Sequence, residues 1–252
     1  LLSSCGSVPL TGRKQVLLVS DQEVLSSSLT QYSDYMKSAK KSSSKDGAAM
    51  VTRVGKKIAA ATEQYLRNNG LESEIKNFAW EFNLVNDPQV NAFCMPGGKI
   101  VVYEGLMQLV SSDDELAVVV GHEVAHAVAK HSNERMSQQL MAQYGAQILG
   151  QALSNKSAAV QKIGASVYGL GAQYGVMLPF SRKHESEADY MGLVFMAMAG
   201  YNPAVAVNFW QKMSAGKSGS TPEFMSTHPS DATRINEIKQ HLPEIEKYRV
   251  KK

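Results

Sequence analysis

The spacing of apolar residues predicts a chain that is mostly helical. Across long stretches, apolar side chains recur every three or four residues, the period at which one face of an α-helix is buried. Stop signals such as Asn69-Gly70 and Gly200 mark where these stretches end. The helices expected on this basis cover residues 21–40, 47–70, 133–153, 157–177 and 182–199, with a last one starting near Asp231 behind the cap Ser230.

A different pattern follows the second of these helices. Between Phe78 and Leu84 apolar and polar residues alternate, which is the two-residue period of a β-strand. Residues 91–95 and 99–103 flank Pro96-Gly97-Gly98, a sequence typical of a hairpin turn. The chain is therefore predicted to be α+β, with a small three-stranded sheet inside a mostly helical domain.

One more helix is marked sharply at its start. Ser112 precedes Glu115 by three residues, which is the spacing of a capping box, and two aspartates between them favour a helix N-terminus. The run 116–130 that follows is nearly uncharged, apart from three polar residues at its centre. A polar group on an otherwise apolar helix indicates a buried site.

Composition and charge narrow the class of protein. Of the 252 residues, 44% are hydrophobic and 19% are charged, which is typical of a globular protein with a substantial core. The net charge of +3 is small and no dense run of Lys and Arg occurs, which argues against nucleic acid as a partner. Cys5 and Cys94 are too few for a disulfide framework, and Cys94 is expected to be a buried, unpaired residue.

The polar group on the helix at 116–130 has the spacing of a zinc site. His122 and His126 are four residues apart, so both imidazoles lie on one helix face and can bind one metal ion. Glu123 is adjacent and can reach a water molecule bound by that metal. The neighbouring residues are mainly valine and alanine, and burying two histidines and a glutamate among them without a ligand would be costly. The pattern therefore predicts metal binding.

Zinc needs a third protein ligand, and a later acidic helix supplies candidates. Glu185 and Asp189 are four residues apart and share a face, whereas Glu187 points away from it. We expect Glu185 to bind the metal and Asp189 to accept a hydrogen bond from a ligand imidazole. His228, after the Ser/Gly-rich loop predicted at 215–226, is a third signal, although a histidine beside a loop is more often a surface residue.

Together these residues resemble the M48 metallopeptidases. The shared features are the HExxH helix, the ExxxD helix about sixty residues later, the His-Pro pair before a helix with Arg234, and the strand pair ahead of the zinc helix. The family includes membrane-embedded proteases, mitochondrial Oma1 and soluble bacterial lipoprotein relatives. The uncharged runs at 136–155 and 163–181 contain many Gln and Gly residues and are too polar to span a membrane, so the resemblance is to the soluble lipoprotein branch.

The resemblance implies a zincin-like fold with one Zn²⁺ per chain, bound by His122, His126 and Glu185. It also implies that Glu123 is the general base and that His228 faces the substrate carbonyl. The expected activity is that of a zinc endopeptidase acting on unfolded or misfolded envelope proteins.

The substrate is expected to bind as an extended strand. Asn91, Ala92 and Phe93 lie in a short predicted strand just before the zinc helix, and the turn that ends this strand leaves one of its edges open. A polypeptide can add to such an edge through main-chain hydrogen bonds. These three residues are therefore the predicted substrate-binding residues.

The N-terminus predicts a lipid anchor. Leu1-Leu2-Ser3-Ser4-Cys5 resembles the bacterial lipobox, in which cleavage precedes a cysteine that becomes diacylated. Residues 1–16 are then a tether, followed by one domain, 17–252, whose N-terminal helices (17–75) pack on a catalytic part (76–245). The expected location is the periplasmic side of the bacterial envelope, with the anchor in the outer membrane.

Two other functions are compatible with parts of the pattern. A di-iron carboxylate protein also uses an ExxH pair, here Glu123 and His126, but it needs a second such pair and the chain has only one. A zinc-containing chaperone or adaptor for envelope proteins would bind the metal without cleaving peptides. Glu123 argues against this second alternative, because a structural zinc site has no use for a base.

Overall fold

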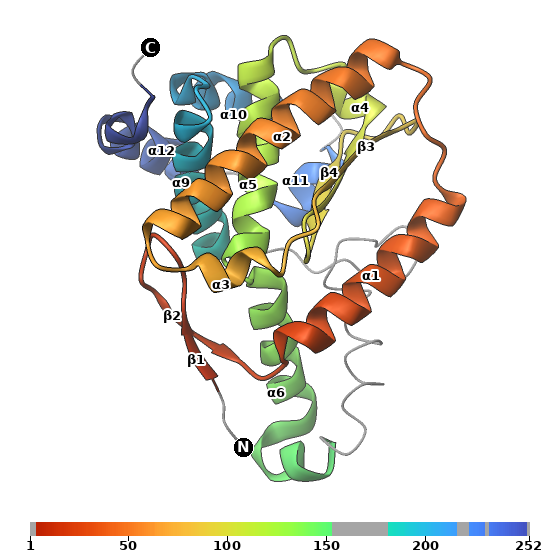
Figure 1. Ribbon diagram of the computed structural model, residues 1–252, viewed down its shortest axis with the longest axis vertical. Helices are drawn as coiled ribbons and strands as arrows, with labels where there is room; N and C mark the ends of the chain where they lie inside the picture. Colours follow the sequence, from red (N-terminus) through yellow and green to blue (C-terminus); the bar gives the residue numbers. More distant parts are fainter. Residues whose placement is uncertain (1–3, 153–180, 216–221, 230–231, 251–252) are drawn as a thin grey trace.

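The structure is a computed structural model that describes residues 4–152, 181–215, 222–229 and 232–250. Three long helices pack on one another at its centre: α2 (Lys45–Asn68), α5 (Asp113–Val128) and α9 (Arg182–Met198). Figure 1 shows α2 crossing the pair formed by α5 and α9. In the described part of the chain the other helices are α1 (Asp21–Ser38), α3 (Glu72–Ile75), α4 (Glu104–Met107), α6 (His131–Ala152), α10 (Ala206–Ala215), α11 (Glu223–Thr227) and α12 (Ala232–Ile245), with 3₁₀ turns at Pro203–Val205 and Glu246–Tyr248.

Serine caps begin the long helices, because a serine hydroxyl accepts a backbone N–H that has no partner inside the first turn. The caps of α1, α2, α5 and α9 are Ser20, Ser44, Ser112 and Ser181. The helices predicted near 21–40, 47–70, 116–130, 133–153 and 182–199 are confirmed. The helix expected at 157–177 and the start near Ser230 and Asp231 lie outside the described residues. Within the loop predicted at 215–226, residues Glu223–Thr227 form α11 instead.

The sheet has three strands in the order β3-β5-β4, which are Glu81–Val85, Lys99–Tyr103 and Ala92–Met95. The predicted hairpin is confirmed: β4 runs antiparallel to β5, and the turn between them places Gly97 and Gly98 at φ values of 94° and 82°. The first strand begins at Glu81, later than expected, and pairs with β5 in parallel. The α+β class is therefore confirmed.

The central strand β5 is buried on both faces, and alternate residues enter two different parts of the core. Ile100 and Val102 pack with the large cluster around α2, α5 and α9. Val101 and Tyr103 pack in a second cluster with residues of α1 and the first turns of α6. The sheet thereby fixes its edge strand β4 against α5, the helix that carries the HExxH motif.

The N-terminal segment differs from the tether expected at residues 1–16. Residues Ser4–Ser7 (β1) and Lys14–Leu17 (β2) form an antiparallel hairpin, and β2 contacts α6. The chain after β2 is tied to α6 by hydrogen bonds from Leu18 N to Ser137 Oγ and from Asn133 Nδ2 to Val19 O, at 2.9 and 2.8 Å. These strands are only four residues long, and the apolar run 16–19 shows no two-residue period, so alternation along the sequence does not reveal them.

A pair of glycines lets α5 and α9 approach closely. A Cβ atom on Gly121 would lie 2.7 Å from Gly192 O, and a Cβ on Gly192 would lie 2.7 Å from the backbone at Gly121 and His122. Any larger residue at either position would force the two backbones apart. The close approach matters because α5 carries His122 and His126, whereas α9 carries Glu185.

Candidate metal centre

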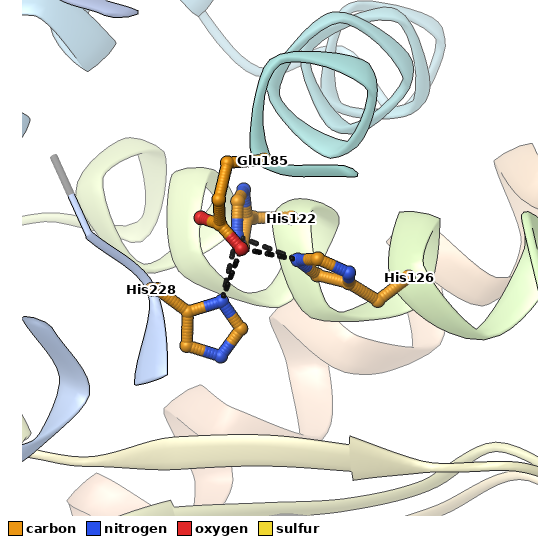
Figure 2. A group of neighbouring side chains, drawn as sticks. All are labelled: His122, His126, Glu185 and His228. Atoms are coloured by element: carbon orange, nitrogen blue, oxygen red, sulfur yellow. Dashed lines mark hydrogen bonds and ion pairs between the residues drawn. The ribbon is translucent and has the colours of Figure 1, made fainter. Parts of the chain in front are cut away.

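The two histidines of the HExxH motif point to one place, as Figure 2 shows. Both are buried side chains of α5, with His122 1% and His126 3% exposed. Their Nε2 atoms lie 3.0 Å apart. Two ligand nitrogens on one tetrahedral zinc ion stand about 3.3 Å apart, given Zn–N bonds of about 2.0–2.1 Å. The spacing of the two nitrogens thus fits a shared metal ion.

Glu185 of α9 completes the group from the opposite side. Its carboxylate oxygens lie 3.3 Å from His122 Nε2 and 3.2 Å from His126 Nε2. His228, the C-cap residue of α11, adds its Nδ1 atom 3.2 Å from His122 Nε2 and 3.0 Å from Glu185 Oε1. One ligand atom from each of these four residues lies within 4.8 Å of all the others.

The donor set and its ionisation suit zinc, which binds imidazole nitrogen and carboxylate oxygen. Burial holds the pKa of His126 well below its usual value, so this ring is neutral and its lone pair is available. Burial opposes ionisation of Glu185, but His228 and Arg234 outweigh it and hold the pKa of Glu185 well below its usual range. Burial also opposes the charged form of His122, yet Glu185 and Asp189 raise the pKa of that ring to about 9. Zinc and a proton therefore compete for His122.

His122 is oriented by residues of α9 and α12. Its Nδ1 atom lies 2.9 Å from Asp189 Oδ1, on the side of the ring away from the other donors. Arg234 forms a two-point ion pair with Asp189, and its Nη1 also lies 2.8 Å from Glu185 Oε2. A single buried arginine thus neutralises both carboxylates that approach the cluster from α9.

Glu123 lies beside the cluster and outside it. Cys94 N, in the edge strand β4, donates to Glu123 Oε2 at 3.1 Å. Glu123 Oε1 accepts no hydrogen bond from the described residues, and His228 Nε2 lies 3.4 Å from it. Burial raises the pKa of Glu123, against the opposing effect of His228 and His122. A carboxylate with a raised pKa and one unused oxygen is suited to accept a proton.

His228 is placed differently from what its sequence context indicates. It is 4% exposed, and its ring stacks on Phe224 with centroids 4.5 Å apart. The resemblance implied a residue that faces the substrate, whereas the structure places Nδ1 among the metal donors. With four protein ligands a zinc site is closed, and with three it keeps a position for water.

The predicted substrate strand is the edge strand of the sheet, but its residues differ in what they face. Phe93 packs edge-on against Tyr35, in the core cluster below the sheet. Asn91 Oδ1 accepts from Ala92 N, and Asn91 O accepts from Tyr103 N. Phe224 N, at the start of α11, donates to Val90 O just before the strand. Of the three predicted residues, Ala92 is the one on the same strand face as Cys94, two positions away, and the Cys94 N–H reaches Glu123.

A second buried group adjoins the cluster, and sequence reasoning missed it. His131 Nδ1 lies 2.8 Å from His126 Nδ1, and His131 Nε2 lies 2.9 Å from Glu187 Oε2. Glu187 does point away from Asp189, as expected, but it is 6% exposed and binds Arg13 of the N-terminal segment. The sequence offers little that could have revealed this group. His131 and Glu187 are ordinary helix residues in their local context, and no short-range pattern joins them to residue 13.

The residue proposed as a lipid anchor, Cys5, lies in β1. Among the described residues, none of the helices combines the length and apolar character needed to cross a bilayer.

Comparison with known proteins finds a family and several similar proteins. Peptidase family M48 matches residues 52–242. The mitochondrial metalloendopeptidase OMA1 of Schizosaccharomyces pombe is 36% identical over 205 residues, which are 78% of this chain and 53% of that protein. The Arabidopsis thaliana protein of the same name is 40% identical over 168 residues (67% of this chain, 33% of that protein).

A bacterial protein is among the relatives as well. The Beta-barrel assembly-enhancing protease of Yersinia pestis is 33% identical over 174 residues, which are 64% of this chain and 36% of that protein. The chain thus spans about half, or less, of the length of these relatives.

Proposed function

Because the chain belongs to peptidase family M48, we propose that it is a zinc metalloendopeptidase. The observation that carries this proposal is the convergence of His122, His126 and Glu185 on one buried point, with Glu123 beside it. Two imidazoles and one carboxylate are a common ligand set of catalytic zinc in peptidases. A base outside the ligand set is needed for hydrolysis and not for structural zinc.

When bound, zinc would polarise the scissile carbonyl and make a water molecule more acidic. The protein's own part begins with Glu123, whose Oε1 is available to take a proton from the attacking water. The Cys94 N–H holds the other oxygen of this carboxylate and so keeps Oε1 directed at the reaction site. Asp189 and Arg234 hold His122 in the ring orientation that presents Nε2 to the metal.

Two roles are open to His228 in this scheme, that of a metal ligand and that of a hydrogen-bond donor to the substrate. As a fourth ligand through Nδ1 it would close the site, and as a hydrogen-bond donor it would stabilise the negative charge that develops on the carbonyl oxygen. We propose that it does the latter during turnover. A donor aimed at the developing oxyanion typically contributes about 10²–10³ in kcat.

We propose that substrates are unfolded or misfolded envelope proteins, bound as an extended strand along β4. Support comes from the position of β4 at the sheet edge against α5. Main-chain pairing recognises backbone instead of side chains, so selectivity for sequence should be loose and folded proteins should resist cleavage. An Ala92→Pro variant removes a backbone donor and should raise KM for an unfolded substrate. Unchanged KM in a correctly folded Ala92→Pro protein would place the docking strand elsewhere.

We further propose that Cys5 is diacylated and holds the protein at the outer membrane, on the periplasmic side of a bacterial envelope. The support is the lipobox-like sequence and the bacterial relative. In cells, a Cys5→Ser variant should move from the membrane pellet to the soluble fraction. Retention of Cys5→Ser in the pellet would contradict the anchor.

The experiment that tests the activity compares the wild type with Glu123→Gln. Both proteins should contain one zinc ion per chain, because Glu123 is outside the ligand set. Only the wild type should cleave an unfolded protein such as reduced casein at an appreciable rate. In the variant the cleavage rate should fall about 10²–10⁴-fold. Absence of cleavage by both proteins would favour a zinc-containing chaperone or adaptor instead, and prevention of aggregation without cleavage would support that function directly. Equal cleavage by both proteins would show that Glu123 is not the general base.

A further inference from the structure

The zinc-facing histidine His126 has a second buried contact, on the ring nitrogen that faces away from the metal cluster. Its Nδ1 atom lies 2.8 Å from Nδ1 of His131, a residue that is completely buried at the start of α6. His131 turns its other nitrogen, Nε2, to Glu187 Oε2 at 2.9 Å. The side chains therefore form a line from the metal cluster through His126 and His131 to Glu187.

The protons on this line follow from the chemistry of its ends. A histidine that binds a metal through Nε2 carries its proton on Nδ1, so His126 donates to His131. His131 accepts on Nδ1 and therefore carries its own proton on Nε2, from which it donates to the Glu187 carboxylate. Each hydrogen bond has one donor and one acceptor, and the carboxylate at the far end fixes the direction of both.

We propose that His131 and Glu187 are positioning residues for the zinc ligand His126, and that Arg13 of the N-terminal segment holds them in place. This inference rests on the proposed zinc site. His126 is thereby oriented indirectly, through an imidazole that contacts a carboxylate. His122, in contrast, contacts the carboxylate of Asp189 directly.

Arg13 is placed to hold Glu187 in the required position. Its Nε donates to Glu187 Oε2 at 2.8 Å, and its two Nη atoms donate to the carboxylate of Glu134 at 2.9 and 2.7 Å. Thr11 donates to the other oxygen of Glu187. The side chains of Arg13, Glu187 and Glu134 are only 13%, 5% and 10% exposed, so the guanidinium is the main charge opposite two largely buried carboxylates.

The hairpin that carries Arg13 is attached to the same helix as His131. Hydrogen bonds at Leu18 and Val19 tie the chain after β2 to Ser137 and Asn133 of α6. Arg13 is outside the region that matches the family, 52–242. An N-terminal segment that the family match leaves out thus supports a metal ligand.

If these residues position the metal ligand, replacing them changes zinc affinity; if they form only a structural ion-pair network, replacing them changes stability alone. Residues that orient a metal ligand typically change metal affinity by about 10–100-fold when they are replaced. Replacing a structural ion pair lowers the free energy of unfolding and leaves the affinity of the folded protein for zinc unchanged. Zinc affinity measured on folded protein therefore separates the two roles.

The test uses three variants of the zinc-loaded protein. His131→Phe removes both ring nitrogens and keeps a ring that stacks on His184, where the present centroids are 4.4 Å apart. Arg13→Met removes the charge that holds Glu187. The matched control is Arg53→Met, which breaks a comparable two-point pair between Arg53 and Asp113 at the exposed start of α5.

The first measurement is the zinc dissociation constant from competition with a chelator. It should rise about 10–100-fold in His131→Phe and towards the lower end of that range in Arg13→Met, and it should stay unchanged in Arg53→Met. The second is the proton NMR signal of the His126 Nδ1–H. In the wild type this proton should be far downfield and slow to exchange, and in His131→Phe both properties should be lost.

Two results would overturn the inference: wild-type zinc affinity in folded His131→Phe, or equal affinities in Arg13→Met and Arg53→Met. If His131→Phe does not fold, Glu187→Gln replaces it, because it keeps the shape of the side chain and removes the charge. Wild-type affinity in Glu187→Gln would then overturn the inference. A wild-type protein that binds no zinc would refute the proposed function instead, so the two failures are distinct.

Discussion

The two histidines of one helix are supported by opposite ends of the chain. His122 is held from the C-terminal side, by Asp189 of α9 and Arg234 of α12. His126 is held from the N-terminal side, through His131 and Glu187 to Arg13. In the first support, the carboxylate of Asp189 contacts the ligand histidine directly. In the second, the imidazole of His131 lies between the ligand histidine and the carboxylate of Glu187.

The difference shows how one site draws on distant parts of a sequence. Both carboxylates come from the same helix, two residues apart, and each is paired with one arginine, Glu187 with the partly buried Arg13 and Asp189 with the buried Arg234. They leave α9 on different sides, so Asp189 reaches His122 while Glu187 reaches His131. A helix that supplies the ligand Glu185 therefore also supplies both supports.

The largest expected effect is on zinc content, and it distinguishes the metal ligand Glu185 from the positioning residue Glu187. Glu185→Ala should reduce zinc from one ion per chain to almost none, because it removes one of three ligands. Glu187→Ala should retain zinc at saturating concentrations and show only a weakened affinity. Metal analysis after dialysis against micromolar zinc measures both. Equal loss in the two variants would mean that Glu187 and not only Glu185 contacts the metal.

A large effect is also expected from His228→Phe. The new ring can stack on Phe224 as the old one does, so the fold and the zinc content should persist. The value of kcat should fall about 10²–10³-fold with little change in KM, which is the signature of an interaction made in the transition state. Loss of zinc in this variant would instead identify His228 as a necessary ligand, as its position in the cluster also allows.

A smaller effect on zinc affinity is expected when the residues that orient His122 and His126 are replaced. Asp189→Asn should raise the zinc dissociation constant about 10–100-fold, with Asp113→Asn, at the start of α5 and paired with Arg53, as an unaffected control. Because Asp189 and His131 act on different ligands of one zinc ion, the loss of zinc affinity in the double variant with His131→Phe should exceed that of either single variant. A double variant no worse than either single variant would show one shared support.

The smallest effect is a dependence of stability on pH. Burial opposes ionisation of Glu134, but His184 and Arg13 outweigh it and lower its pKa from 4.5 to about 2. A carboxyl with a lowered pKa in the folded state stabilises above about pH 4.5, and this contribution is lost as pH falls towards about 2. In urea titrations of metal-free protein, Glu134→Gln should therefore lose less stability over this interval than the wild type. Parallel curves would contradict the assignment.

The parts of the fold that sequence could predict are those set by local pattern. The Ser112 cap, the helix behind it and the Pro96-Gly97-Gly98 hairpin depend on neighbours a few residues away. The same holds for the i, i+4 pairs that place His122 with His126 and Glu185 with Asp189 on common faces. These pairs contain the zinc ligands that we propose.

The parts that could not be predicted depend on contacts across the chain. The bond from Arg13 to Glu187 joins residues 174 positions apart, and the short hairpin that carries Arg13 has no apolar alternation. The packing of Gly121 on Gly192 is likewise invisible in sequence, because a glycine in a helix carries no pattern of its own. Local spacing therefore identifies ligands, and tertiary packing decides what orients them.

X-ray absorption at the zinc edge of the loaded protein identifies the atoms that bind the metal, so it measures the proposed ligand set itself. The account predicts one zinc ion per chain with only nitrogen and oxygen ligands at about 2.0–2.1 Å, including the scattering pattern of at least two imidazoles. That pattern should be unchanged in His131→Phe at saturating zinc, whereas His126→Ala, which lacks one of the three ligands, should hold almost no zinc. A sulfur ligand at about 2.3 Å, or an unchanged imidazole count in His126→Ala, would contradict the account.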